Sequence, residues 1–135
     1  MKNERGQSLV ELSVSLVLLL LLLAGAVEFG MAFFQFVQLR DAAQEGALYG
    51  SMNPTDTAGI TARVQGASNS PINLTTITPS ITYPDTKQCE GYGIKVELTY
   101  SHHIFMPFIP QVIGTHDIPL KASVTDTILS PVCPP

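Results

Sequence analysis

The sequence predicts an α+β protein in which a long N-terminal helix packs on a small antiparallel β-sheet, with one short extra helix. Three observations lead to this prediction. Residues 12–27 form a charge-free apolar run, and the residues after it keep a helical periodicity to residue 50. Two later segments, 93–101 and 118–129, alternate apolar and polar side chains as half-buried strands do. The chain of 135 residues has room for one small domain beside the helix.

The apolar run at 12–27 has the composition of a membrane-spanning helix. Its length at helical rise is about 24 Å, slightly less than a hydrocarbon core of about 30 Å. Continuing the helix supplies the difference, so the membrane segment is expected at about residues 12–36. Lys2 and Arg5 precede the run and the next cation is Arg40, which favours a cytoplasmic N-terminus and an exported C-terminal part.

Two carboxylates flank the apolar run. Glu11 lies five residues after Gly6, and a carboxylate in an apolar membrane segment costs about 3 kcal/mol even on a permissive insertion scale. Cleavage after Gly6 would create an amine at Gln7 that could compensate it. Glu28 lies about 25 Å further along the helix, so it cannot share that partner, and it is expected at the outer membrane interface.

The N-terminal fifty residues resemble a known family. The stretch ERGQSLVEL, the leucine run, VEFG at 27–30 and RDAAQEGALYG at 40–50 together look like the TadE family of tight-adherence pilus pseudopilins. The first of these stretches also resembles the class III signal peptide of type IV prepilins. The resemblance implies that a prepilin peptidase cuts between Gly6 and Gln7, and that Glu11 then meets the new amine of a neighbouring subunit.

The resemblance also implies a pilin-like fold and a set of partners: other pilin or pseudopilin subunits, the pilus assembly machinery and membrane lipid. The chain is expected to comprise a cytoplasmic leader (1–6), an N-terminal helix (7–50) and an exported α+β head (51–135). The expected location is the cytoplasmic (inner) membrane, single-pass, with the head outside, and the cell surface or pilus after assembly. Major subunits of the resembling group are little more than the helix, so this head favours a minor pilin or pseudopilin; the alternative is a major pilin.

Two other interpretations of the N-terminus stay open. The leader cations, the leucines and an A-x-A site at 24–26 also fit a secretory signal peptide cut after Ala26, which would release a secreted binding module. Against that cut, Glu11 lies inside the apolar region and the helical pattern continues past the site. The second interpretation is a generic single-pass anchor, which explains neither Gly6 nor Glu28.

The second half of the long helix is expected to turn an apolar stripe toward the head. The stripe is predicted from spacings of three and four residues and comprises Phe29, Phe33, Phe36, Leu39, Ala43 and Ala47. The polar face opposite it comprises Gln35, Gln38, Asp41 and Glu45. Gly50 is expected to end the helix.

In the head, Thr55 or Asp56 is expected to cap a short helix that ends at about Gln65. A further strand is expected at 74–83, where Pro79 removes a ladder donor and favours an edge position or a bulge.

An apolar loop at 104–113 connects the two alternating strands, and its prolines at 107 and 110 are expected to keep it from becoming a helix. Two uses of this loop stay open. It could be a subunit-contact surface or a lid over the open end of the sheet. The side chains expected at such a contact are Phe105, Met106, Phe108 and Ile109.

Other side chains bear on chemistry. Cys89 and Cys133 both follow the membrane run, so they reach the exported side, where a disulfide between them would tether the proline-rich tail.

The histidines 102, 103 and 116 are expected on the surface, and adjacent strand residues face opposite ways, which disfavours a shared metal ion. No catalytic motif, metal site or cofactor is predicted, so we expect a structural protein rather than an enzyme. A net charge of −4 without a basic stripe argues against a nucleic-acid partner.

Overall fold

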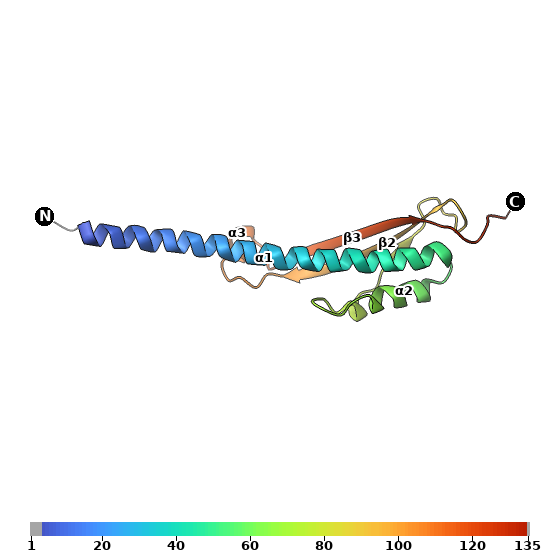
Figure 1. Cartoon of the computed structure of the whole chain (residues 1–135), viewed down its shortest axis with the longest axis horizontal. Helices are drawn as coiled ribbons and strands as arrows, with labels where there is room; N and C mark the ends of the chain where they lie inside the picture. Colours follow the sequence, from blue (N-terminus) through green and yellow to red (C-terminus); the bar gives the residue numbers. More distant parts are fainter. Residues whose placement is uncertain (1–3, 135) are drawn as a thin grey trace.

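A computed structural model describes residues 4–134 as one long helix that carries an α+β head on its C-terminal half (Figure 1). Residues 1–3 of the expected leader, and residue 135, lie outside the described part. The elements in chain order are α1 (Glu4–Met52), α2 (Thr57–Gly66), the 3-10 helix η1 (Leu74–Thr76), β1 (Ser80–Thr82), β2 (Gly93–His103), α3 (Ile109–Ile113) and β3 (Asp117–Thr127). The predicted α+β fold class is therefore confirmed.

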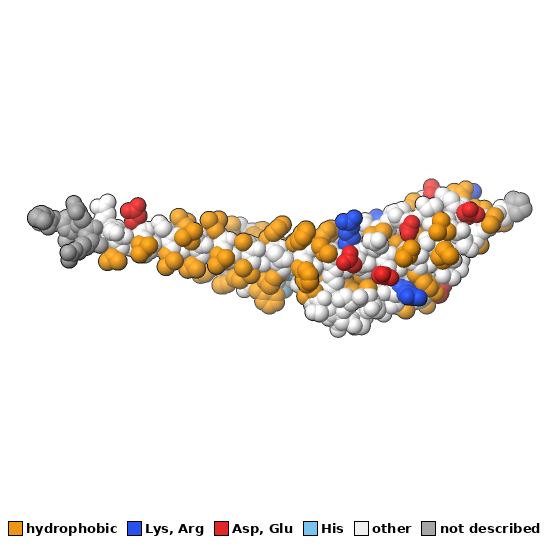
Figure 2. All heavy atoms as spheres, viewed as in Figure 1, with side chains coloured by type: hydrophobic (Ala, Val, Ile, Leu, Met, Phe, Trp, Pro, Cys, Tyr) orange, Lys and Arg blue, Asp and Glu red, His pale blue; other side chains and the backbone are white. Residues whose placement is uncertain are grey.

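Helix α1 has 49 residues, which makes it about 74 Å long, more than twice the thickness of a hydrocarbon core of about 30 Å. Its N-terminal half projects from the head, and Figure 2 shows this part covered by apolar side chains. The six leucines at 18–23 each expose between 45% and 72% of their surface. Among the described residues, α1 is the one helix long and apolar enough to cross a membrane.

The three strands form one antiparallel sheet in the order β1-β2-β3. Strands β2 and β3 pair along their whole length, from Gly93 opposite Thr127 to His103 opposite Asp117. The inward side chains of β2 are fully buried in one core with α1 and α2, namely Ile94, Val96 and Leu98. The alternation predicted for these two strands is confirmed.

The strand predicted at 74–83 is mostly wrong, because β1 contains only Ser80–Thr82. The Asn73 side chain instead accepts a hydrogen bond from the Thr75 N–H, and the Ile77 N–H returns to the Leu74 carbonyl, which closes the 3-10 turn. A local Asn cap of this kind competes with extended structure even among β-branched residues.

The cap predicted for the second helix is confirmed at Asp56, whose carboxylate accepts from the Gly59 N–H at 2.9 Å and from the Tyr49 hydroxyl at 2.8 Å. The Gly59 N–H, with help from Tyr49, lowers the pKa of Asp56, and the same hydroxyl bond raises the pKa of Tyr49. These bonds join the start of α2 to α1.

The apolar stripe predicted on α1 is partly wrong. Leu39, Ala43 and Ala47 are buried as predicted, but Phe29 and Phe33 expose 71% and 56% of their surface. Two glutamines, Gln35 and Gln38, face the head instead of solvent. The Gln38 amide is buried because it pairs with a backbone segment: its Oε1 accepts from the Ile72 N–H at 2.8 Å and its Nε2 donates to the Ile72 carbonyl at 3.0 Å.

Glycines let α1 approach the head closely. A Cβ on Gly46 would lie 2.5 Å from Val64 Cγ2, and one on Gly50 would lie 2.5 Å from Ile94 Cδ1. The prediction that Gly50 ends the helix is wrong, because α1 continues to Met52.

Replacing Gly46 by alanine is expected to destabilise the head by about 1–2 kcal/mol, because overpacking outweighs the helix propensity that alanine adds. Val64 is fully buried and β-branched, so it has little freedom to yield. Thermal unfolding of the detergent-solubilised chain measures the effect. The matched control is Gly30→Ala on the same helix, where a Cβ meets nothing within 4 Å; an equal loss in both variants would refute the packing argument.

Candidate functional site

The residues expected to direct cleavage and assembly lie on the projecting half of α1. Gly6, Gln7 and Glu11 are all in helical conformation and exposed. A Cβ on Gly6 would meet nothing within 4 Å. The Glu11 carboxylate is thus presented on the helix surface, directly before the apolar run at 12–27, where the side chain of another molecule can reach it.

A second carboxylate on α1 is not at the surface. Glu28 exposes only 5% of its surface, and the ring of His102 exposes 1%. The His102 Nε2 lies 2.9 Å from Glu28 Oε1, and its Nδ1 lies 2.6 Å from Gln35 Oε1. Glu28 and Gln35 are seven residues apart, so they lie on the same face of α1 two turns from each other.

The same carboxylate binds the chain that leaves β2. Glu28 Oε1 accepts from the Phe105 N–H and Oε2 from the Met106 N–H, both at 3.2 Å. One buried acidic side chain therefore holds the imidazole near the end of β2 and the backbone of Phe105 and Met106 in the following loop against α1. We call Glu28, Gln35 and His102 the Glu28 cluster.

The prediction of surface histidines is wrong for His102. A signal for its burial was present: Ile94, Val96 and Leu98 face inward, and position 102 continues the same alternation. The prediction that His102 and His103 face opposite ways is confirmed, because the His103 side chain is 61% exposed, with its Nδ1 3.1 Å from Asp117 Oδ1.

The apolar connection between β2 and β3 lies beside α1 (Figure 1). The prediction that its prolines exclude a helix is wrong, since Pro110 sits in the first turn of α3, where a missing N–H leaves no bond unmade. Met106 and Ile109 are half-buried, whereas Phe105 and Phe108 expose 69% and 65% of their surface. We call residues 104–114 the hairpin tip.

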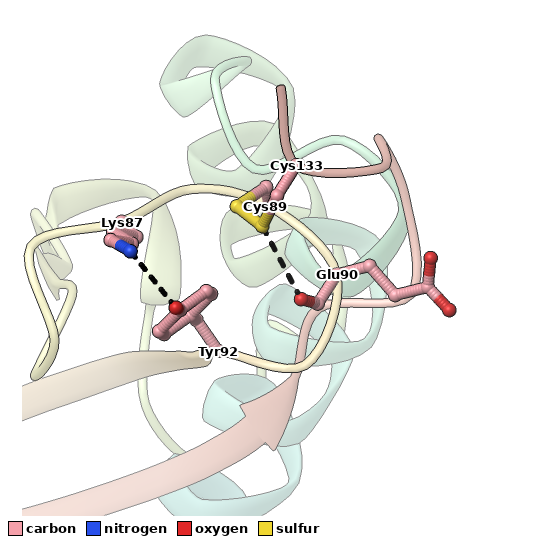
Figure 3. Close-up of a disulfide and its surroundings, with 5 residues drawn as sticks. All are labelled: Lys87, Cys89, Glu90, Tyr92 and Cys133. Carbon is pink, nitrogen blue, oxygen red and sulfur yellow. Dashed lines mark hydrogen bonds between the residues drawn. A yellow bond between two sulfur atoms is a disulfide. The ribbon is translucent and has the colours of Figure 1, made fainter. Parts of the chain in front are cut away.

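The far end of the head is held by Cys89 and Cys133, which form a disulfide with Cα atoms 5.0 Å apart (Figure 3). The Glu90 N–H donates to the Pro131 carbonyl at 2.8 Å, and the Leu129 N–H donates to the Ser51 carbonyl at 2.8 Å. The C-terminal tail is therefore tied both to the segment before β2 and to the end of α1.

Beside the disulfide, Lys87 Nζ lies 3.0 Å from the Tyr92 hydroxyl (Figure 3). That hydrogen bond raises the pKa of Lys87. The contact is exposed.

Serine replacement of Cys133 is expected to cost up to about 4 kcal/mol for a closed loop of 44 residues. The tail should become sensitive to protease and the melting temperature should fall, while the β2–β3 pairing persists. A reductant added to the native chain should reproduce both effects and should change nothing in the Cys89→Ser/Cys133→Ser double variant. A native chain indifferent to reductant would contradict the stabilising role.

Among residues 4–134, no group of three or more His, Cys, Asp or Glu side chains is placed to hold a metal ion. The described part presents an exposed carboxylate on an apolar helix and a buried polar cluster that joins the head to that helix.

These features define a class of protein: in the described part, a long helix able by length and composition to span a membrane continues into a small α+β head. Residues 6–48 match the family model described as TadE-like protein. This match confirms the resemblance to the TadE-like family over residues 6–48, about a third of the chain. No curated protein and no solved structure matches the chain.

Proposed function

We propose that the protein is a minor pilin or pseudopilin, or a pilus-assembly subunit, of a tight-adherence (type IV-like) surface filament. The observation that carries this proposal is the projecting half of α1, a long apolar helix with the exposed carboxylate of Glu11 at its start. The chain inserts in the cytoplasmic membrane with its N-terminus inside and its head outside, a prepilin peptidase removes residues 1–6, and the helices of successive subunits stack.

The exposed leucines of α1 suit both the membrane-inserted chain and the assembled filament. In the membrane, lipid covers them, and a helix satisfies its own backbone hydrogen bonds. Outside the membrane the same surface would face water, at a cost of roughly 25 cal/mol per Å² of apolar area. Side-by-side packing with the α1 helices of other subunits removes that cost and creates the core of a filament.

Cleavage between Gly6 and Gln7 supplies the polar partner for this packing. Gly6 lowers helix stability by about 1 kcal/mol relative to alanine, so the scissile stretch opens more readily than the leucine run does. The new amine of Gln7 and the carboxylate of Glu11 on a neighbouring helix then compensate each other in a low-dielectric core. Their pairing fixes the register of the stack.

The packing of the head supports this function over a secreted module released after Ala26. Residues 24 and 25 are half-buried and line the groove beside the hairpin tip, so α1 already belongs to the head before the A-x-A site ends. Cutting there would remove part of that contact.

A head of this size favours a minor subunit, and a major pilin of such a filament is the alternative. In the assembled filament, we assign a contact with neighbouring subunits to four side chains of the hairpin tip: Phe105, Met106, Phe108 and Ile109. The reason is that Phe105 and Phe108 are exposed and the tip lies beside α1.

Shearing filaments from cells of the native host tests the proposal. The chain should be found in the filament fraction, and its amount relative to the main filament protein distinguishes a minor from a major subunit. Finding the chain only as free protein in the medium would overturn the proposal in favour of the secreted module.

A further inference from the structure

An open apolar groove lies between α1 and the hairpin tip. Its volume is about 800 Å³, and apart from Glu28 and His102 its lining is entirely apolar. The helix contributes Val17, Leu20, Leu21, Ala24, Gly25, Phe29 and Ala32. The groove is thus continuous with the leucine surface that, under the proposed function, faces lipid.

The position of the tip along α1 places it at the depth of the hydrocarbon. A core of about 30 Å that begins at Leu12 ends near Met31, so the last residues of the segment expected at about 12–36 lie in the outer headgroup region. Glu28 then lies about 5 Å, and Ala24 about 10 Å, inside the outer boundary. This is the depth at which amphipathic segments rest in one leaflet, about 5–10 Å into the boundary between headgroups and acyl chains.

The tip contains no charged side chain, and several of its backbone donors are paired. The N–H groups of Phe105 and Met106 bind Glu28, and that of Ile104 binds the His116 carbonyl at 2.9 Å. The N–H of Gly114 binds the Pro110 carbonyl at 2.8 Å, and the two prolines have no N–H to satisfy. Because lipid offers no hydrogen bonds, each of these pairings lowers the cost of placing the tip in hydrocarbon.

Polar side chains mark where the tip ends. His103 and Asp117 lie opposite each other at the last rung of the sheet, both exposed and 3.1 Å apart between Nδ1 and Oδ1. The ring of His116 stacks near that of His103, with centroids 6.4 Å apart. These groups form a wet rim directly above an apolar tip.

We propose that, before assembly, the hairpin tip is embedded in the outer leaflet of the membrane and that phospholipid acyl chains fill the groove between it and α1. The inference rests on the proposed membrane insertion of α1 and adds a second element to that anchor. The Glu28 cluster then fixes the tip to α1 at this depth. It supplies hydrogen-bond partners for the polar groups at the place where α1 and the tip enter the hydrocarbon together. Lipid is the favoured occupant because the groove opens onto the lipid-facing surface of the same helix.

The chain has no tryptophan, so single tryptophans can report depth. The variants are Phe108→Trp in the tip, Leu20→Trp in the middle of α1 and Leu129→Trp in the head. Each replaces an apolar side chain that is 54% to 65% exposed, so folding should be kept. Val112→Trp, at a position 88% exposed, is a second probe of the tip. The full chain is placed in vesicles of phosphatidylcholine with brominated or unbrominated acyl chains, at high lipid excess.

Bromine should quench both tip variants about as strongly as Leu20→Trp, and it should leave Leu129→Trp unchanged. If Leu20→Trp is quenched and the tip variants are not, the inference is wrong while the membrane anchor stands. If the tryptophan fluorescence of the tip variants is shielded from bromine only at a high protein-to-lipid ratio, a second copy of the chain fills the groove. That result would also overturn the inference. If Leu20→Trp itself escapes quenching, the anchor fails and the inference fails with it.

Discussion

Replacing Glu28 by alanine is expected to release the hairpin tip from α1 while β2 and β3 stay paired. The substitution leaves the His102 ring and the N–H groups of Phe105 and Met106 without their acceptor. Each buried polar group left unpaired costs about 1–3 kcal/mol, so we expect the tip to lose about 3 kcal/mol or more. This corresponds to opening about a hundredfold more often.

Hydrogen exchange at residues 104–114 of the detergent-solubilised chain measures this release. Glu28→Gln keeps one acceptor oxygen and should show a smaller effect. The matched control is Glu45→Ala, an exposed carboxylate on the same helix, which should leave exchange in the tip unchanged. A double-mutant cycle with His102→Ala should give a non-additive result, because the two side chains are in direct contact. Unchanged exchange in Glu28→Ala would show that the cluster does not hold the tip.

Replacing Glu11 by alanine is expected to remove the chain from filaments and to leave its amount in the membrane unchanged. Without the carboxylate, the amine of Gln7 enters a filament core uncompensated, at a cost of about 3 kcal/mol per subunit on the insertion scale. In the membrane the change is harmless, since alanine is more apolar than glutamate. Leader cleavage should still occur, because the scissile bond at Gly6 is untouched.

Immunoblots of the sheared filament and membrane fractions read out this result. Ser13→Ala is the matched control. Ser13 lies half a turn from Glu11 and is exposed, and its hydroxyl donates to the Val10 carbonyl of its own helix at 2.8 Å. That variant should be incorporated normally. Incorporation of Glu11→Ala at the level of the unaltered chain would remove the electrostatic account of stacking.

The sequence predicts the parts of the fold that depend on local pattern. The alternation in β2 and β3 and the Asp56 cap are read from neighbouring residues, and the structure confirms them. Local chemistry also explains a failure at 74–83, where the Asn73 cap bends the chain before a strand can form. The prediction fails at Pro110 because proline breaks helices in their interior but is accommodated in their first turn.

The parts that could not be predicted depend on partners distant in the chain. Glu28 and His102 are 74 residues apart, and Gln38 and Ile72 are 34 apart. Alternation places His102 on the inward face but does not say which helix residue meets it. In the sequence alone, a glutamine or glutamate is expected on the surface, because the distant partner that allows its burial is not visible there. The contact of Glu11 stays a prediction because it forms between two chains.

The central claim is that this chain is a prepilin-like subunit matured by cleavage between Gly6 and Gln7. N-terminal sequencing and intact mass of the protein isolated from filaments and membranes of the native host test it most directly. The account predicts a mature chain that starts at Gln7. A chain that starts at Val27 would identify a secretory signal peptide, and a chain that keeps Met1 would identify an uncleaved anchor; either result would contradict the account.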